Sequence, residues 1–286
     1  MAGMPEIIWS RGHQDSGGGG RRLRFLAILT GCVVLCLPNV SMGEQALVRY
    51  TEGIAHGFLA LRTLQGEKIA DGETTQVAHG NRVTSHLVFR FKDGSLYDET
   101  TVFTQHGRFR LLSDHLIERG PSFKQPVATF INAATGQVTV RYKDGDKEKV
   151  RSQKLNLPPD LVNGILYTIL KDIQPTAPQS TFSMLVASPK PRLVKLVILP
   201  QGEEAFRSAG GKREAVHYLM KVKIGGVAGV VAPLVGKQPP DTQIWLLAGD
   251  APAFLRLEGP LYDGGPIWRI EMAVPAFPAS GGKESK

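Results

Sequence analysis

The sequence predicts a mainly β protein of the α+β class, in which a large antiparallel sheet packs against one amphipathic helix. Apolar and polar residues alternate with period two along most of the chain, and turn signals rich in Gly and Asp separate these stretches. A single segment, at about 157–173, has helical spacing instead. Because alternation with period two is typical of strands with one buried face, one sheet with an apolar face follows.

A hairpin is predicted where residues 83–91 are followed by a turn. One face of a strand would carry Val83, Ser85, Leu87, Phe89 and Phe91, and the other face would carry Thr84, His86, Val88 and Arg90. Asp93-Gly94 then supplies the residues that a tight turn needs. A two-residue turn at this point would pair Phe91 with Leu96 and keep the apolar faces of both strands together.

Similar turn signals lie on both sides of this hairpin. Gly80-Asn81 precedes it, and residues 132–136 separate two later strands. From Leu47 to about Leu155 we therefore expect an antiparallel meander.

The helix predicted at about 157–173 carries a broad apolar stripe. Pro158 and Pro159 are tolerated in a first helical turn, and Pro175 ends the helix. Such a stripe cannot face water, so the helix must pack on the sheet. Burying five of its side chains would contribute on the order of 10 kcal/mol.

Strands resume after the helix, at 182–187, 193–199, 215–224, 242–247, 253–257 and 267–274, with glycine turns at 210–211 and 263–266. We expect a leader at 1–43, a single β-rich domain at 44–278 and a disordered polar tail at 279–286. The halves of that domain, 44–155 and 179–275, are joined by the helix.

The N-terminal residues predict export. Three arginines at 21, 22 and 24 precede an apolar run at 25–37, and Ser41-Met42-Gly43 offers the small residues that a signal peptidase recognises. A spanning helix needs about 20 apolar residues, so this run is too short. Cleavage near Gly43 predicts a periplasmic or secreted protein.

A competing processing site is the lipid-attachment motif at 29–32. Cleavage there would leave the protein lipid-anchored through Cys32, but the apolar run continues past this residue and favours the later cut. Both cysteines of the chain, Cys32 and Cys36, precede Gly43. A protein cut at Gly43 therefore has no disulfide, thiolate nucleophile or cysteine-based zinc site.

No motif predicts a catalytic, metal or cofactor site. The histidines show no HxH, HxxH or HExxH spacing, and no GxSxG is present. The Gly-rich segment 225–241 lacks the spacing of a phosphate-binding loop. Asp114 and His115 are adjacent, but adjacent strand residues point to opposite faces. We therefore expect no cofactor and no metal, and an enzyme is the less favoured interpretation.

The net charge of +8 comes from basic residues spread along the chain, often beside acids. Nucleic-acid sites cluster basic residues with stacking aromatics, so we expect no nucleic-acid partner. Membrane contact is expected to be peripheral at most.

An export signal, a cysteine-free meander and an amphipathic helix between two groups of strands together resemble the half-barrel architecture of periplasmic lipoprotein-localisation factors and related bacterial envelope families. The resemblance covers about Leu47 to Val274 and includes no diagnostic motif. It implies a large curved antiparallel sheet, or half-barrel, which wraps the helix and leaves an apolar cavity.

The expected function is that of an exported binding protein, which holds an apolar or lipid-like ligand between the concave sheet face and helix 161–173. The candidate lining residues are Leu161, Ile165, Ile169, Leu87, Phe89, Trp245 and Trp268. The first alternative is a structural or protein-interaction module of the envelope, which would use a sheet edge or the 225–235 loop. A cell-envelope hydrolase is a further alternative. It would require a cleft that gathers carboxylates, or a His with a Ser or an Asp.

Overall fold

The computed structural model describes residues 45–208, 211–225, 238–250 and 252–273. The expected leader with Cys32 and Gly43, the Gly210 side of the turn at 210–211, most of the Gly-rich segment 225–241 and the tail from 279 lie outside the described residues. Within the described ranges, no helix is long and apolar enough to cross a membrane.

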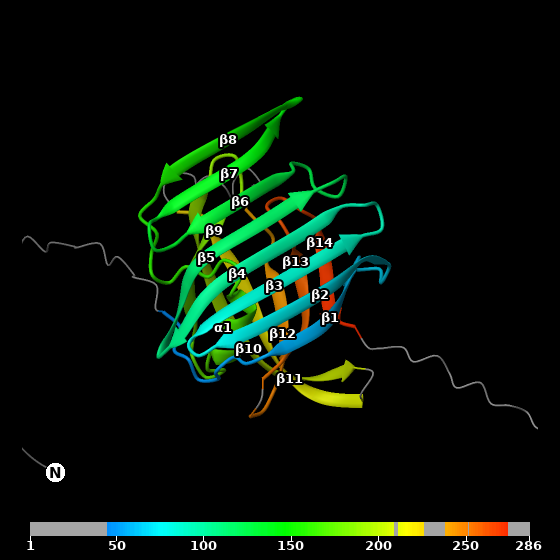
Figure 1. Ribbon diagram of the computed structural model, residues 1–286. Helices are drawn as coiled ribbons and strands as arrows, with labels where there is room; N and C mark the ends of the chain where they lie inside the picture. The colour runs from blue at the N-terminus through cyan, green and yellow to red at the C-terminus, as the bar shows by residue number, and fades with distance from the viewer. Residues whose placement is uncertain (1–44, 209–210, 226–237, 251, 274–286) are drawn as a thin grey trace, which may run out of the picture. The chain divides into compact units, whose positions relative to one another are not determined.

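In the described part of the chain, 14 antiparallel strands form one curved sheet that does not close (Figure 1). The strands are β1 (Ala55–Arg62), β2 (Lys68–His79), β3 (Arg82–Phe91), β4 (Leu96–His106), β5 (Arg108–Arg119), β6 (Val127–Asn132), β7 (Gln137–Asp144), β8 (Lys147–Lys154), β9 (Ser180–Val186), β10 (Arg192–Ser208), β11 (Gly211–Lys223), β12 (Thr242–Leu247), β13 (Phe254–Pro260) and β14 (Ile267–Met272). The order across the sheet is β8-β7-β6-β5-β4-β3-β2-β1-β14-β13-β12-β11-β10-β9. Strands that follow one another in the chain are neighbours in the sheet, except β8 and β9, which form its two edges. β1 pairs with β14 and so joins the two halves.

The meander expected between Leu47 and Leu155 is confirmed by strands β1 to β8. The turn at Gly80-Asn81 is tight, since His79 pairs with Arg82 across it. The longer loop at 132–136 also joins two paired strands, β6 and β7. The turn residues and the alternation of apolar and polar side chains therefore predicted the positions of these strands correctly.

The expected register of the hairpin at Asp93-Gly94 was wrong by one residue. The Phe91 N–H donates to the carbonyl of Ser95, so the turn is longer than two residues, and Arg90 rather than Phe91 pairs with Leu96. A shift of one residue reverses the two faces of a strand. In β4 it places Tyr97, Glu99 and the residues that alternate with them in the interior.

The helix α1 (Leu166–Asp172) is shorter than the helix expected at 157–173. Gly164 has a φ of 63°, which is left-handed and interrupts a helical path. Before it, Leu161 forms a parallel bridge with Ser183. Residues 160–163 therefore run beside β9 and are not helical.

The core lies on the concave face of the sheet, and both halves contribute to it. The rings of Phe91 in β3 and Trp268 in β14 have centroids 5.5 Å apart. Tyr167 of α1 contacts Phe254 of β13 with a centroid separation of 5.4 Å. In Figure 1, α1 lies between β1–β8 in front and the later strands behind. The two halves thus form one packed unit around the helix.

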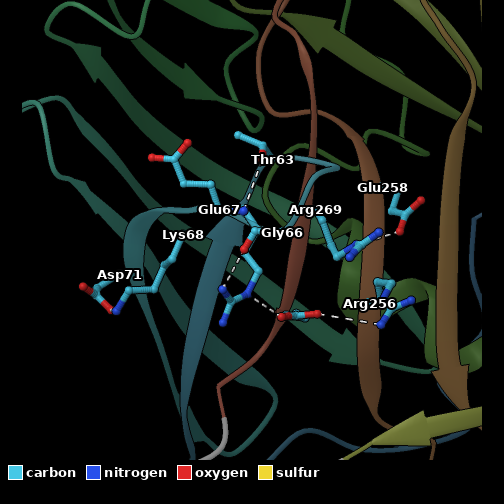
Figure 2. Close-up of polar contacts among 10 residues, drawn as sticks. Thr63, Gly66, Glu67, Lys68, Asp71, Arg256, Glu258 and Arg269 are labelled. Carbon is cyan, nitrogen blue, oxygen red and sulfur yellow. Dashed lines mark hydrogen bonds and ion pairs between the residues drawn. The ribbon is translucent and has the colours of Figure 1, made fainter.

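The opposite face of β13, β14, β1 and β2 carries a set of ion pairs, part of which Figure 2 shows. Arg269 Nε lies 2.8 Å from Glu258, and Arg256 lies 3.8 Å from Glu271. Arg62 of β1 also binds Glu271, at 2.7 Å, across the junction of the two halves. Ion pairs near the surface contribute about 0–1 kcal/mol each, so these pairs add little to the stability of the sheet.

Candidate functional site

A hollow of about 250 Å³ lies at one end of the interior, beyond the C-terminal end of α1. We call it the end hollow. Its floor consists of Ile173, Val216, Tyr218 and Leu246, which belong to the buried core. Inward-facing positions of β11 and β12 supply three of these side chains. The end hollow therefore borders the buried core.

Charged side chains form the rim of the end hollow: Arg49, Lys171, Glu203 and Asp250. The Lys171 ammonium lies 2.5 Å from a Glu52 carboxylate oxygen. The end hollow therefore combines apolar and charged lining residues.

Backbone and side-chain contacts fix α1 beside the end hollow. The Asp172 carboxylate accepts hydrogen bonds from the backbone N–H groups of Arg49 and Tyr50, at 2.5 and 2.8 Å. Its second oxygen, Oδ2, is buried without a partner, and burial raises the pKa of Asp172. The Tyr218 hydroxyl donates to the carbonyl of Ile173 at 3.3 Å. These contacts tie the chain before β1 to the last turn of the helix.

A second hollow, with a larger volume of about 420 Å³, lies between residues 133–136 and 154–157. Residues 133–136 line it together with Leu155, Asn156 and Leu157, and Lys154 is its charged group. It provides neither a buried apolar floor nor converging polar groups, so the end hollow is the better candidate.

Three carboxyl groups lie inside the sheet, beneath the start of α1. They belong to Glu99 of β4 and to Asp114 and Glu118 of β5, and we call them the carboxyl cluster. Tyr97 donates to Glu99 at 2.9 Å, and Thr101 donates to Asp114 at 2.8 Å. Within the described residues, no Lys, Arg or His forms an ion pair with any of the three.

Burial controls the protonation of the carboxyl cluster. It raises the pKa of Asp114 to about 7, although the hydrogen bond from Thr101 lowers it. Burial, with the negative charge of Asp263, raises the pKa of Glu118 to about 8. The pKa of Glu99 is raised well above its usual range by burial and then by the charge of Asp114. At neutral pH the cluster therefore retains protons.

Groups with raised pKa values are candidate acids and bases. The carboxyl cluster is enclosed, however, with 8%, 1% and 5% of Glu99, Asp114 and Glu118 exposed. A substrate cannot reach them in this structure, so the cluster does not favour a hydrolase. Sequence reasoning missed the cluster because the expected register directed Glu99 outward.

Ser183, Lys195 and Asp160 also meet in a cluster that superficially resembles a catalytic set. The Lys195 ammonium donates to the Ser183 hydroxyl at 2.8 Å and to Asp160 at 3.0 Å. Ser183 is 1% exposed, and its hydroxyl also donates to the Asp160 carboxylate at 2.9 Å, so a substrate cannot reach it in this structure. The cluster is therefore structural. It attaches residues 160–163 to β9.

The structure brings most of the expected lining residues into one core. Leu161, Ile165 and Ile169 are buried, as are Phe89 and Trp268. Leu87 is partly buried and packs against the same cluster. The concave face is thus filled by the protein's own side chains around α1, and the end hollow lies next to this packed region.

Trp245 has a different location. It lies between Ile244 and Leu246, which face the core, and therefore points to the opposite face of the sheet. There it stacks on His217, with ring centroids 4.8 Å apart. Trp245 was expected to line the concave face, but the alternation of side chains along β12 directs it to the opposite face.

The described residues contain no group of three or more His, Cys, Asp or Glu side chains that could hold a metal ion.

No family model matches the sequence, and no curated protein matches it. Among solved structures, one match is the β-barrel-like protein of Domain of Unknown Function DUF1849 from Brucella abortus. The two chains are 9% identical, the match covers 78% of this chain and 98% of that chain, and the TM-score is 0.42. Similarity at this level carries no argument about function.

Proposed function

We propose that this protein is an exported, non-enzymatic binding protein and that its apolar or lipid-like ligand occupies the end hollow. The observation that carries the proposal is the apolar floor of this hollow, continuous with the core and surrounded by a charged rim. An amphiphile would place its apolar part on Ile173, Val216 and Leu246. Its polar part would remain at the rim, beside Arg49 and Lys171.

The volume of about 250 Å³ limits the part of the ligand that the hollow can hold. A longer apolar chain would extend along the concave face and displace part of α1. The helix has seven residues, too few to be stable without packing, so its conformation depends on its contacts with the sheet. Displacement of α1 would uncover Ile165 and Ile169, two of the expected ligand-lining residues.

Native mass spectrometry tests whether a ligand is present. Protein expressed with its leader and purified without detergent should carry a co-purifying amphiphile, which is released on denaturation. Titration with cis-parinaric acid, a fluorescent fatty acid, then tests the location. Val216→Trp fills the hollow and should weaken this binding at least tenfold, whereas Val150→Trp, at a position that is 59% exposed, should leave it unchanged.

Equal affinity of the two tryptophan variants would exclude the end hollow as the binding site. Absence of a co-purifying amphiphile, together with no saturable cis-parinaric acid binding, would contradict the ligand-binding function itself. Circular dichroism of Val216→Trp checks that the fold is retained.

Export is part of the same proposal and rests on the pattern at 21–43. Intact-mass measurement of the protein from fractionated cells distinguishes the processing routes. A mass that begins after Gly43 in a soluble fraction supports a periplasmic or secreted protein. An acylated Cys32 in the membrane fraction would show instead that the protein is lipid-anchored.

A protein-interaction module is the second candidate function. A specific observation favours it: the edge strand β8 is exposed at every position except Gln153, and among the described residues it pairs with β7 alone. The two functions are compatible, because β8 and the end hollow involve different residues.

A further inference from the structure

The two edge strands of the sheet, β8 and β9, differ in whether their outward backbone groups are hydrogen-bonded. At β9, another segment of the chain covers the edge. The Val162 N–H donates to the carbonyl of Ser183 at 2.9 Å, and the Ser183 N–H donates to the carbonyl of Asp160 at 3.0 Å. The Asn163 side chain then bonds both the N–H and the carbonyl of Leu185, each at 2.8 Å. The outward backbone groups in the middle of β9 are therefore occupied.

At β8, the described chain supplies no such cover. The Leu155 N–H, just after the strand, donates to Gly136 at 2.8 Å and so points toward the β7 side. Because backbone direction alternates along a strand, the N–H and carbonyl groups of Glu148, Val150 and Ser152 point away from β7. The pairing between β7 and β8 has no bulge, so this alternation holds throughout.

Charge on β8 is also arranged with period two. One face of the strand carries Lys147, Lys149 and Arg151. Their partners in β7 are Asp144, Tyr142 and Val140. All three are exposed. The strand as a whole contains four basic residues and one acid, Glu148. Lys149 forms an ion pair with Asp144 of β7, whereas Lys147 and Arg151 form none among the described residues. An added strand beside β8 would thus meet three cations on one face, one of them shared with Asp144.

We propose that the open edge of β8 binds an extended acidic segment of a partner protein as a further strand of the sheet. Main-chain hydrogen bonds to Glu148, Val150 and Ser152 would hold the segment. Acidic side chains at alternate positions of the partner would lie beside Lys147, Lys149 and Arg151. A second copy of this chain is a poor occupant, because two such basic edges would repel each other.

The competing explanation is that lysines on an edge strand only prevent unwanted pairing. Proline, a bulge and a short strand are other ways in which proteins protect an edge. β8 has none of these: it is eight residues long, contains no proline and pairs regularly with β7. The other edge strand, β9, is covered by residues 160–163 and does not depend on charge for protection.

A peptide-binding experiment tests the proposal. The probe is a fluorescein-labelled, end-blocked peptide of alternating glutamate and threonine, long enough to span β8. The control peptide has the same composition, but its glutamates form one block. Fluorescence anisotropy should show saturable binding of the alternating peptide, at least tenfold tighter than that of the block peptide, because only the alternating peptide matches the spacing of the cations.

Val150→Pro provides a specific test of the backbone contacts. It removes an N–H that points outward and leaves the hydrogen bonds to β7 intact, so the fold should be retained while binding weakens at least tenfold. Val150→Thr keeps the N–H and should bind as well as the natural sequence. Lys149→Glu should weaken binding through its charge.

Equal binding of the two peptides would overturn the proposal, since it would show charge attraction without strand pairing. Full binding by Val150→Pro would overturn it as well. Should that variant fail to fold, the same question is answered with a peptide N-methylated at alternate positions, which cannot pair with the β8 edge. This modified peptide should bind at least tenfold more weakly than its parent. No saturable binding of any peptide would show that the lysines only protect the edge.

Discussion

Glu118 and Asp114 connect the stability of the fold to pH. Their ordinary pKa values lie near 4, so the unfolded chain releases both protons above about pH 4. The folded chain retains them until about pH 7 for Asp114 and about pH 8 for Glu118. Their contribution to stability is therefore fully present below about pH 4 and is lost as pH rises through the folded pKa values.

We predict that the free energy of unfolding decreases between about pH 5 and pH 8, by up to about 4 kcal/mol per carboxyl group. Glu118→Gln removes one titrating group and keeps its size. This variant should be more stable than the natural sequence at pH 8 and similar to it at pH 5, as measured by urea denaturation. Identical pH dependence of the two proteins would show that Glu118 is not the group that titrates.

Gly164 is a second residue with a structural requirement that can be tested. A Cβ at this position would lie 1.8 Å from Thr101 Oγ1 and 2.8 Å from Asp114 Oδ1, and φ is 63°. Gly145 has the same φ but nothing within 4 Å of a Cβ. Gly145→Ala therefore measures the backbone cost alone.

We predict that Gly145→Ala destabilises the protein by about 1 kcal/mol, because an alanine is strained in the left-handed region. Gly164→Ala should cost roughly 3–5 kcal/mol, since it also displaces the Thr101 and Asp114 pair. Thermal or urea denaturation of both variants gives the comparison. Equal costs would show that Gly164, just before α1, does not approach β4 and β5 as closely as the structure indicates.

At the level of elements, the strands were predictable and their exact pairings were not. The alternation of apolar and polar residues and the glycine turns predicted the meander, because both patterns depend only on residues that are close in sequence. The register at Asp93-Gly94 depended on one extra turn residue, and the carboxyl cluster depended on that register. The non-helical course of 160–163 depends on β9, a strand that follows later in the chain. The register and the course of 160–163 depend on contacts between segments that are distant in sequence, so local patterns could not predict them.

The candidate site was partly predictable for the same reason. The apolar stripe of Leu161, Ile165 and Ile169 predicted residues buried against the sheet, which the structure confirms. The end hollow combines α1, the chain before β1, and strands β11 and β12. No sequence pattern brings these four segments together.

The edge cover at β9 gives a prediction at the same level. Asn163→Ala removes the two side-chain hydrogen bonds to Leu185 and leaves buried backbone groups without partners. We expect a loss of about 2 kcal/mol and increased self-association, because an uncovered edge can pair with another chain. Urea denaturation and light scattering measure the two effects. Asn156→Ala, at an exposed position, is the matched control and should change neither.

At the level of the described domain, the two halves are joined by the pairing of β1 with β14 and by one core around α1. Leu61 of β1 is fully buried in this core. The tryptophans of the second half, Trp245 and Trp268, lie in β12 and β14. The halves should therefore unfold together, and a change in β1 should be detected at both tryptophans.

Leu61→Ala creates a cavity and should cost about 2–5 kcal/mol. In protein cut at Gly43, tryptophan fluorescence reports the second half, and far-UV circular dichroism reports all strands. We expect the same midpoint from both probes in urea, shifted equally by Leu61→Ala and only slightly by Leu193→Ala, at a position that is 39% exposed. If the fluorescence midpoint stayed fixed while circular dichroism showed an earlier transition, the halves would be independent units. In that case β9–β14 would have to keep their core without β1, and the end hollow, whose floor comes from β11, β12 and Ile173, would survive the loss of the first half.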